Sequence, residues 1–376
     1  MFSNARAPTT DARRVPAFGV VLAVLMVVDP CRAAADAIQL PSSPGGFDFH
    51  VSTRGADSNP GDHWARPLRT IQRALQLAQP GHRIAIHAGE YYEDVRSVRD
   101  GRSDAPIGLI GSAGTIIKGI GSDRVIEIRH SHMVLMNIAV DGKISDGNGR
   151  VSYRDKLVYL FGRSEQAGIT GVRLLHMRLR NAGGECVRMK YFAHHNEVAY
   201  STITDCGVDD FHGKGNARNG EGIYIGTAPE QLHRNPTIKL DRSHGNWIHH
   251  NHFETRGNEC VDIKEASRFN LIEYNSCTGQ LDENAAGISA RGNDNIIRFN
   301  VIWGNRGAGI RFGGDTARDG IHNHAYGNVL RSNAVAAFKI MAGPQRRICG
   351  NDVVTDAAPI ARGTFAKGVQ PSSPCP

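Results

Sequence analysis

Two basic residues in the C-terminal half of the chain occupy equivalent positions in neighbouring sequence repeats. Lys264 ends the segment Glu259–Lys264, and Arg291 ends the aligned segment Ala286–Arg291. Strands at matching positions of a stacked repeat lie about 4.8 Å apart, so these two side chains should face one ligand. A lysine can act as a base when its pKa is lowered, which an adjacent guanidinium and a nearby cation would do. Abstraction of a proton alpha to a uronate carboxylate is a reaction that suits such a pair. Alternatively, both residues are solvated surface cations, the usual state of Lys and Arg.

Three glutamates stand at the entrances of successive predicted strands, at Glu185, Glu221 and Glu259. Like charges on adjacent rungs repel unless a positive charge lies among them. A hard cation with oxygen ligands, Ca²⁺ first, would relieve the repulsion, and Asp262 is a further candidate ligand. In the alternative, one or more of the glutamates accept hydrogen bonds from turn amides or pair with Arg188.

Strand alternation assigns the faces of these segments. Val261 and Ile263 should point inward, so Asp262 and Lys264 should point outward. The outward column beside Lys264 supplies three candidate substrate contacts: Arg188, Tyr224 and Arg311.

The repeat itself is marked by asparagine pairs five residues apart. The copies are Asn246/Asn251, Asn270/Asn275, Asn295/Asn300 and Asn323/Asn328, with Asn196/Ser201 as a degraded first copy. A predicted strand precedes each copy, which is typical of a solenoid. Extra residues in 207–220 and 227–245 indicate long loops, which should form the walls of a binding cleft.

The N-terminal region has its own organisation. Residues 1–35 read as a signal peptide, with a basic start, a short apolar core at Ala17–Val28 and small residues before a cleavage site. Residues 36–46 form a predicted linker, 47–355 the solenoid and 356–376 a C-terminal tail. Within the solenoid, Leu68–Ala78 should form an amphipathic helix that covers the apolar open end.

The composition of the chain limits the classes of partner that it is expected to bind. The chain has 376 residues and 43 glycines, which favours short strands and turns over a helical protein. Signal removal takes away four arginines and two aspartates, so the net charge falls from +7 to about +5. A basic exported protein favours an anionic partner, while the lack of a Lys/Arg-rich block argues against nucleic acid. We expect a secreted monomer, extracellular or periplasmic, with no stable membrane span after signal removal.

Cysteine usage agrees with export. Cys31 would leave with the signal peptide, and six cysteines remain: Cys186, Cys206, Cys260, Cys277, Cys349 and Cys375. An even number in an exported chain predicts disulfides, although free buried thiols are the alternative. Cys186 and Cys260 share a column but lie two rungs apart, about 9.6 Å, which exceeds the roughly 7 Å limit between bridged Cα atoms. The same objection separates Cys206 from Cys277. We therefore favour Cys186–Cys206 and Cys260–Cys277, with Cys349–Cys375 in the tail.

Three N-terminal segments resemble the entry to pectate-lyase-like right-handed parallel β-helices: Phe49–Gly61, Pro67–Ala74 and Pro80–Tyr91. The resemblance implies an all-β fold, a right-handed parallel β-helix with an N-terminal capping helix. The asparagine pairs resemble the stacked asparagine ladders that such proteins place in their turns.

The segment Glu259–Lys264, the strand ending in Arg291 and the segment Gly309–Gly313 resemble polysaccharide lyase family six, the alginate lyases and the dermatan-cleaving chondroitinase. There, an acidic residue five positions before a lysine base ligates calcium, and an arginine one coil later is the acid. The resemblance implies Ca²⁺ ligation by Glu221 and Glu259, with Lys264 as base and Arg291 as acid. Two departures are Gly257, where a second acid is expected, and Gly292, where the family usually has His.

We therefore expect β-elimination of a uronic-acid-containing polysaccharide. Lys264 would take the C5 proton, and Arg291 would assist at the leaving oxygen or stabilise the carboxylate. Other functions stay open. Asp205, Asp209 and Asp210 would suit a family-nine-like pectate lyase, and a galacturonan hydrolase would need more than the Asp209–Asp210 pair. The fold also serves non-catalytic glycan-binding or surface proteins. A histidine metal site would draw on a separate patch: His194, His195, His249, His250 and His252.

Overall fold

The computed structural model describes residues 46–121, 123–145, 148–211, 219–356 and 358–376. The expected signal peptide lies outside these ranges, as does the expected linker apart from residue 46. No helix within the described ranges is long and apolar enough to cross a membrane.

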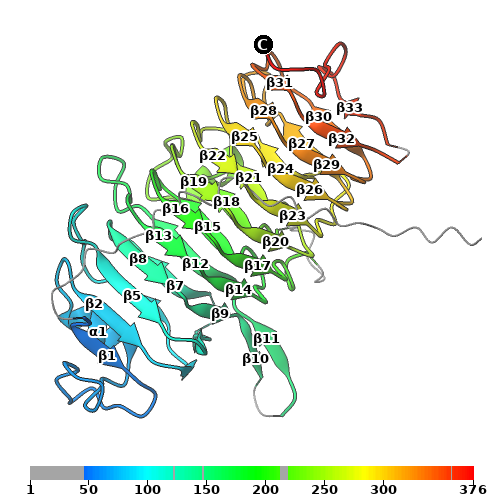
Figure 1. Ribbon diagram of the computed structural model, residues 1–376. Helices are drawn as coiled ribbons and strands as arrows, with labels where there is room; N and C mark the ends of the chain where they lie inside the picture. The colour runs from blue at the N-terminus through cyan, green and yellow to red at the C-terminus, as the bar shows by residue number, and fades with distance from the viewer. Residues whose placement is uncertain (1–45, 122, 146–147, 212–218, 357) are drawn as a thin grey trace, which may run out of the picture. The chain divides into compact units, whose positions relative to one another are not determined.

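Parallel strands form three sheets that run side by side along the stack of coils (Figure 1). The first sheet contains β1 (Phe49–Val51), β2 (Arg83–Ile86), β5 (Ile107–Gly111), β8 (Met133–Met136), β13 (Arg173–Leu175), β16 (Glu197–Ala199), β19 (Trp247–His249), β22 (Leu271–Glu273), β25 (Ile296–Arg298), β28 (His324–Tyr326) and β31 (Ile348–Cys349). The second, which we name the site sheet, contains β4 (Val95–Arg96), β7 (Arg124–Ile128), β12 (Lys156–Phe161), β15 (Val187–Lys190), β18 (Ile223–Ile225), β21 (Val261–Ile263), β24 (Ala286–Ala290), β27 (Ala308–Phe312), β30 (Ala336–Ile340) and β33 (Ala361–Arg362). The third contains β3 (Gly89–Tyr91), β6 (Thr115–Ile117), β9 (Ala139–Asp141), β14 (Arg178–Arg180), β17 (Thr202–Thr204), β20 (His252–Glu254), β23 (Ser276–Thr278), β26 (Val301–Trp303), β29 (Val329–Arg331) and β32 (Asp352–Val354).

This architecture is the right-handed parallel β-helix expected from the sequence. One antiparallel hairpin, β10 (Lys143–Ser145) and β11 (Val151–Tyr153), projects from the coils (Figure 1). Strand pairing continues to β33, past residue 355, where the solenoid was expected to end.

Inward side chains of the site sheet form one continuous apolar column. The register aligns Val187, Ile223, Val261, Ile288 and Ile310, and all five are fully buried in the main core. Their neighbours along each strand point away from this core, as alternation requires. The outward face is therefore free to carry polar groups.

The N-terminal helix α1 (Ile71–Leu77) packs against β1 and β4 at the open end of the stack. Thr70 caps it, its hydroxyl accepting a hydrogen bond from the Arg73 backbone N–H at 3.1 Å. The helix starts three residues later than expected because Leu68 instead forms a β-bridge with Val51. The predicted apolar face is confirmed, since Leu68, Ile71 and Leu75 are all buried.

Asparagine ladders join successive coils. Asn275 illustrates the pattern, because its Oδ1 accepts from both the backbone N–H and the side-chain amide of Asn251, each at 3.0 Å. Its own backbone N–H and amide donate to Asn300 in the next coil at the same distances. A second ladder runs through Asn246, Asn270, Asn295 and Asn323. A third ladder, Gln280–Asn305–Asn333, escaped the sequence reasoning.

The ladders hold a strained turn in place. Residues directly before ladder positions adopt positive φ even when they are bulky, as in His250 (53°), Tyr274 (53°) and Phe299 (54°). Such conformations are unfavourable for residues with a side chain and persist only where the surroundings enforce them. Here the coil-to-coil hydrogen bonds provide that enforcement.

Three disulfides connect the cysteines in the favoured pairs, Cys186–Cys206, Cys260–Cys277 and Cys349–Cys375. In the first two disulfides, a cysteine directly before a site-sheet strand bonds to a cysteine on the third-sheet side of the same coil. The distance argument from the repeat is thus confirmed.

Replacing Asn275 by Ala should destabilise the protein by roughly 3 kcal/mol, because several buried donors and acceptors would lose their partners. The measurement is urea denaturation followed by circular dichroism. The exposed Asn284→Ala is the matched control and should change stability by less than about 0.5 kcal/mol. Equal effects of the two substitutions would contradict a structural role for the ladder.

Candidate functional site

The site sheet brings Lys264 and Arg291 together through a shared carboxylate. Ile263 pairs with Ala290, so the residues that follow them lie on adjacent rungs. The Lys264 Nζ lies 2.7 Å from Asp262 Oδ2, and the Arg291 Nε lies 3.5 Å from Asp262 Oδ1. Asp262 is fully buried and Lys264 is 7% exposed. Asp262 and Lys264 are thus largely shielded from solvent, whereas the Arg291 side chain stays 23% exposed.

Asp262 changes the expected electrostatics of Lys264. Burial opposes the charged ammonium, but the Asp262 carboxylate outweighs it and raises the pKa of Lys264. The sequence reasoning expected a lowered pKa from the neighbouring guanidinium together with a nearby cation. Arg291 does act to lower the pKa of Lys264, but Asp262 has the larger and opposite effect. Strand parity located Asp262 on the correct face, but it did not reveal that a residue two positions away would pair with the lysine.

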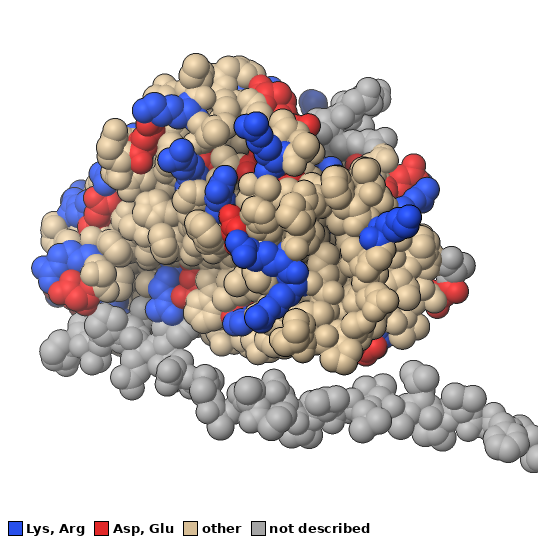
Figure 2. Space-filling model, turned by 90° about the horizontal axis from the view of Figure 1, so that it is seen from above, with Lys and Arg blue, Asp and Glu red and all other residues tan. Residues whose placement is uncertain are grey.

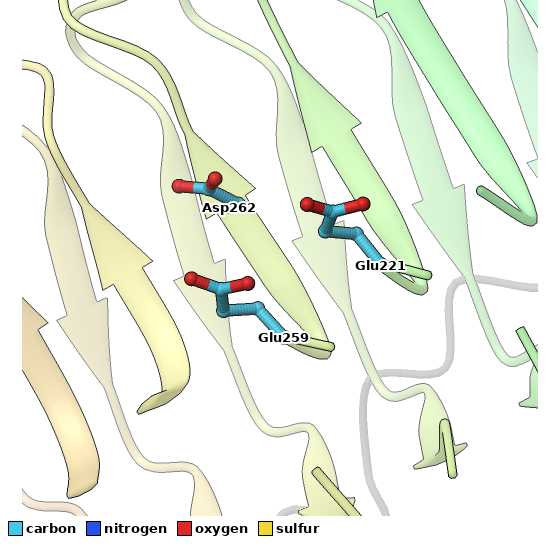
Figure 3. A group of neighbouring side chains, drawn as sticks. All are labelled: Glu221, Glu259 and Asp262. Carbon is cyan, nitrogen blue, oxygen red and sulfur yellow. The ribbon is translucent and has the colours of Figure 1, made fainter. Parts of the chain in front are cut away.

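A buried acidic triad lies beside this pair. Glu221, Glu259 and Asp262 each offer a carboxylate oxygen, and these atoms lie within 4.8 Å of one another. Figure 3 shows Glu259 and Asp262 along one strand segment and Glu221 at the start of the neighbouring strand. Burial and the neighbouring carboxylates of Glu185 and Glu259 raise the pKa of Glu221 to about 8. Burial and Asp262 likewise raise the pKa of Glu259.

The triad fits a metal ion. Glu221 Oε2 accepts from the Gly220 backbone at 2.9 Å, and Glu259 Oε1 accepts from Ser289 Oγ at 2.9 Å. Glu259 Oε2 is buried with no hydrogen-bond partner among the described residues. A buried carboxylate oxygen without a donor is costly, and a hard cation with oxygen ligands would satisfy it. The residues present could therefore hold a metal ion.

Glu185, also predicted from the sequence as a metal ligand, lies outside the triad. Its Oε2 lies 2.9 Å from Lys156 Nζ and its Oε1 accepts from Arg188 Nη1 at 2.9 Å. Burial opposes the charge of Glu185, but Lys156 and Arg188 outweigh it and lower its pKa to about 2. Pairing with Arg188 was the alternative considered for these glutamates. Lys156 could not be anticipated, because its strand precedes the recognisable repeats.

The three candidate substrate contacts occupy one column, as predicted, but differ in access. The Tyr224 ring lies between two cations, 3.4 Å from the Arg188 guanidinium carbon and 4.4 Å from Lys264 Nζ. The ring is 2% exposed, so its faces are not open for stacking on a sugar. Arg311 pairs in register with Ser289, and its Nε has no hydrogen-bond partner among the described residues.

Two clefts lie beside the outward-facing column of the site sheet that holds Lys264 and Arg291. One of about 700 Å³ lies over β7, β12 and β15, and one of about 680 Å³ is lined by Glu265, Phe269 and Arg318 among others. The loop after β18, which includes the 3-10 helix η1 (Pro229–Arg234), lines both clefts. A wall-forming loop was predicted here, while half of the other expected loop, 207–220, lies outside the described residues. Lys and Arg side chains also form a row across the face shown in Figure 2.

Lys190 lines the first cleft and was not singled out from the sequence. It is 7% exposed, and no described residue forms an ion pair or side-chain hydrogen bond with its ammonium group. Burial and the adjacent Arg188 guanidinium lower the pKa of Lys190 to about 8. The repeated pattern Glu-Cys-Val-x-x-Lys, at 185–190 and 259–264, is the signal that would have found it.

The histidine patch is occupied by other contacts. His249 Nε2 lies 3.1 Å from Glu197 Oε1, and His252 Nδ1 lies 2.7 Å from Ser276 Oγ. Within the described residues, the acidic triad is the group of metal-ligating side chains that converges. The aspartates of the pectate-lyase alternative do not join it, and Asp205 pairs with Arg256 at 3.4 Å.

One family model matches most of the chain. Residues 53–360 match the family model described as "Protein of unknown function (DUF1565)". The chain belongs to this family. No curated protein sequence matches it. The structure is similar to the alginate lyase from Paenibacillus sp. str. FPU-7, with a TM-score of 0.65 and 18% identity over 79% of this chain and 95% of that one.

Two further solved structures share the architecture. The PL6 family alginate lyase AlyGC gives a TM-score of 0.52 and 18% identity, covering 73% of this chain and 36% of that one. Pectate lyase Pel9A gives a TM-score of 0.54 and 15% identity, covering 86% of this chain and 80% of that one. At identities this low, the structural similarity shows a lyase-like parallel β-helix fold and no more. Any activity must be argued from the site itself.

Replacing Lys190 by Met should stabilise the folded protein by roughly 1 kcal/mol at pH 7, after allowing for solvent screening at the cleft. Because the folded pKa is lowered, the cost of the buried cation is full below pH 8. It declines between pH 8 and the ordinary lysine value of 10.5. Urea denaturation at pH 7 and near pH 10.5 measures this, and the gain should shrink at the higher pH. Lys143→Met, at an exposed lysine on β10, is the control.

Proposed function

We propose that this protein is a polysaccharide lyase that cleaves a uronic-acid-containing polysaccharide by β-elimination. The observation that carries the proposal is the placement of Lys264 and Arg291 on adjacent rungs around Asp262, beside a buried acidic triad. The likeness in fold to alginate and pectate lyases supports it. The basic net charge, +7 for the full chain and about +5 without residues 1–35, suits an acidic polymer.

The chemistry assigns a separate task to each basic residue. In its neutral form, Lys264 takes the C5 proton of a uronate unit, the C4–O bond breaks, and a C4=C5 double bond forms. Asp262 raises the pKa of Arg291, which makes that guanidinium a poor proton donor. Arg291 therefore stabilises the negative charge that develops on the uronate carboxylate, and water supplies the proton to the leaving oxygen.

Lys264 must lose its proton before it acts, and Asp262 opposes this. Ca²⁺ held by Glu221, Glu259 and Asp262 would supply positive charge that offsets these acids. Such charge would weaken the hold of Asp262 on Lys264. Among the substrate contacts, Arg188 and Arg311 are the proposed ligands of the polymer, whereas Tyr224 positions Arg188 and Lys264 from between them.

Secretion to an extracellular or periplasmic space remains part of the proposal. The three disulfides fit an oxidising compartment. Residues 1–35 would direct export and be removed, and the mature chain would act as a monomer. The strongest alternative is a glycan-binding β-helix without turnover, since it explains the fold and charge equally well. A family-nine-like pectate lyase is the second, and it predicts activity restricted to pectate.

The direct test is an elimination assay on alginate, pectate and dermatan sulfate. Cleavage should produce the ultraviolet absorbance of an unsaturated uronide, and Lys264→Met should lower kcat/KM by about 10²–10⁴-fold, the usual contribution of a general base. Lys367→Met, at an exposed lysine, should leave the rate unchanged. Flat absorbance on all polymers, with and without Ca²⁺, would reject the lyase in favour of the binding protein.

Metal binding can be tested without activity. Ca²⁺ at about 100 times its Kd should stabilise the protein by about 2.7 kcal/mol, seen as a higher Tm that EGTA reverses. Glu259→Gln should abolish the shift by removing a ligand charge. Glu283→Gln, at an exposed acid on the same coil, should preserve it. A Ca²⁺-induced shift that survives Glu259→Gln would place the ion elsewhere.

A further inference from the structure

The cleft over β7, β12 and β15 has an excess of positive charge. Six Lys and Arg side chains line it against three acidic ones. Several of the cations are already paired: Lys156 and Arg188 with Glu185, and Arg124 and Arg129 with Glu127. An incoming anion would therefore find its counter-charge mainly on cations that remain unpaired.

Lys190 is the buried cation that fits this description. It shares an outward column with Lys264, two rungs away, which is about 9.6 Å at the ordinary strand spacing. The two lysines end matching segments, but Arg188 stands where the second segment has Asp262. Lys264 consequently has a carboxylate at 2.7 Å, whereas Lys190 has an adjacent guanidinium.

The other nearby acids do not pair with Lys190. Glu185 is engaged by Lys156 and Arg188. Asp241 accepts from the backbone N–H groups of Tyr191 and Phe192 and from the hydroxyls of Thr227 and Ser243. Both carboxylates are thus committed to other donors. A cation buried without a partner is destabilising unless a counter-ion arrives.

The cleft walls hold this arrangement in place. The rings of Tyr159 and Phe161 stack at 5.5 Å, and Phe161 stacks on Tyr191 at 5.4 Å. The Arg124 guanidinium covers the Tyr159 ring at 3.8 Å. Arg124, Tyr159 and Phe161 line the same cleft as Lys190, and their mutual packing lowers the conformational cost of binding a ligand.

We propose that this cleft is a binding subsite for one acidic sugar unit, whose carboxylate or sulfate group pairs with the Lys190 ammonium. The inference deepens the proposed function and rests on it for the identity of the polymer. A chain lying along the strip would place one acidic unit at Lys190 and another at Lys264. Lys190 acts here as a binding residue, and the elimination step stays at Lys264.

Binding is measured by isothermal titration calorimetry in a Lys264→Met background, which prevents turnover. The probes are oligosaccharides of alginate and pectate, which carry carboxylates alone, and of dermatan sulfate, which also carries sulfate. Lys190→Met should weaken the binding of the preferred oligosaccharide at least tenfold, in line with the loss of a charged hydrogen bond. Lys190→Arg should largely retain it, and Lys143→Met should not change it.

Several outcomes separate this inference from the lyase proposal. If the wild-type protein cleaves a polymer and Lys190→Met raises KM with kcat nearly unchanged, both stand. If cleavage occurs and neither KM nor affinity responds to Lys190→Met, the subsite is overturned while the lyase stands. If no polymer is cleaved but affinity falls in Lys190→Met, the subsite stands and the lyase is rejected. Failure of every oligosaccharide to bind overturns the subsite.

Discussion

The coil-to-coil hydrogen bonds of the asparagine ladders are the constraint on which the site depends. Ladder residues such as Asn275 donate twice to the next coil, so one coil cannot slip relative to its neighbour without leaving buried amides unpaired. A slip of one residue would also exchange inward and outward side chains. In the site sheet it would move Lys264 into the core and Ile263 to the surface. The alignment of Lys264, Arg291 and the acids is therefore fixed by turns on another side of the coil.

Within this fixed register, the site holds several charged groups that are buried away from water. Asp262 is fully buried yet serves both Lys264 and Arg291, so its charge is well compensated. Burial and neighbouring carboxylates raise the pKa values of Glu221 and Glu259, because their few positive neighbours do not offset these effects. Replacing such groups with apolar side chains would ordinarily improve stability. Their presence in a repeat that could carry apolar residues is most simply explained by a ligand that they bind.

Much of the fold could be predicted because a repeat turns sequence columns into spatial neighbours. The strand register, the disulfide pairs and the adjacency of Lys264 and Arg291 all followed from spacing alone. The Asp262–Lys264 ion pair did not, because alternation gives the face of a side chain and not its rotamer. Of the two partners of Glu185, Lys156 was missed because it belongs to a coil without the asparagine signal. Burial of Tyr224 between Arg188 and Lys264 was missed because the repeat gives the column of each residue but not the side-chain packing within it.

The two matching segments, 185–190 and 259–264, show how one substitution changes the role of a lysine. Both lysines lie in the same column and are equally exposed at 7%. Lys190 ends β15, and Lys264 directly follows β21. Asp262 supplies the second lysine with a fixed counter-charge, so that lysine is held in place within the protein. At the equivalent position beside Lys190 stands Arg188, which offers no counter-charge. Arg188 also binds Glu185, the acid that could otherwise have paired with Lys190. The same backbone thus presents a paired cation, Lys264, and an unpaired cation, Lys190, in a single column. Only Lys190 has an electrostatic need for an anion from outside the protein.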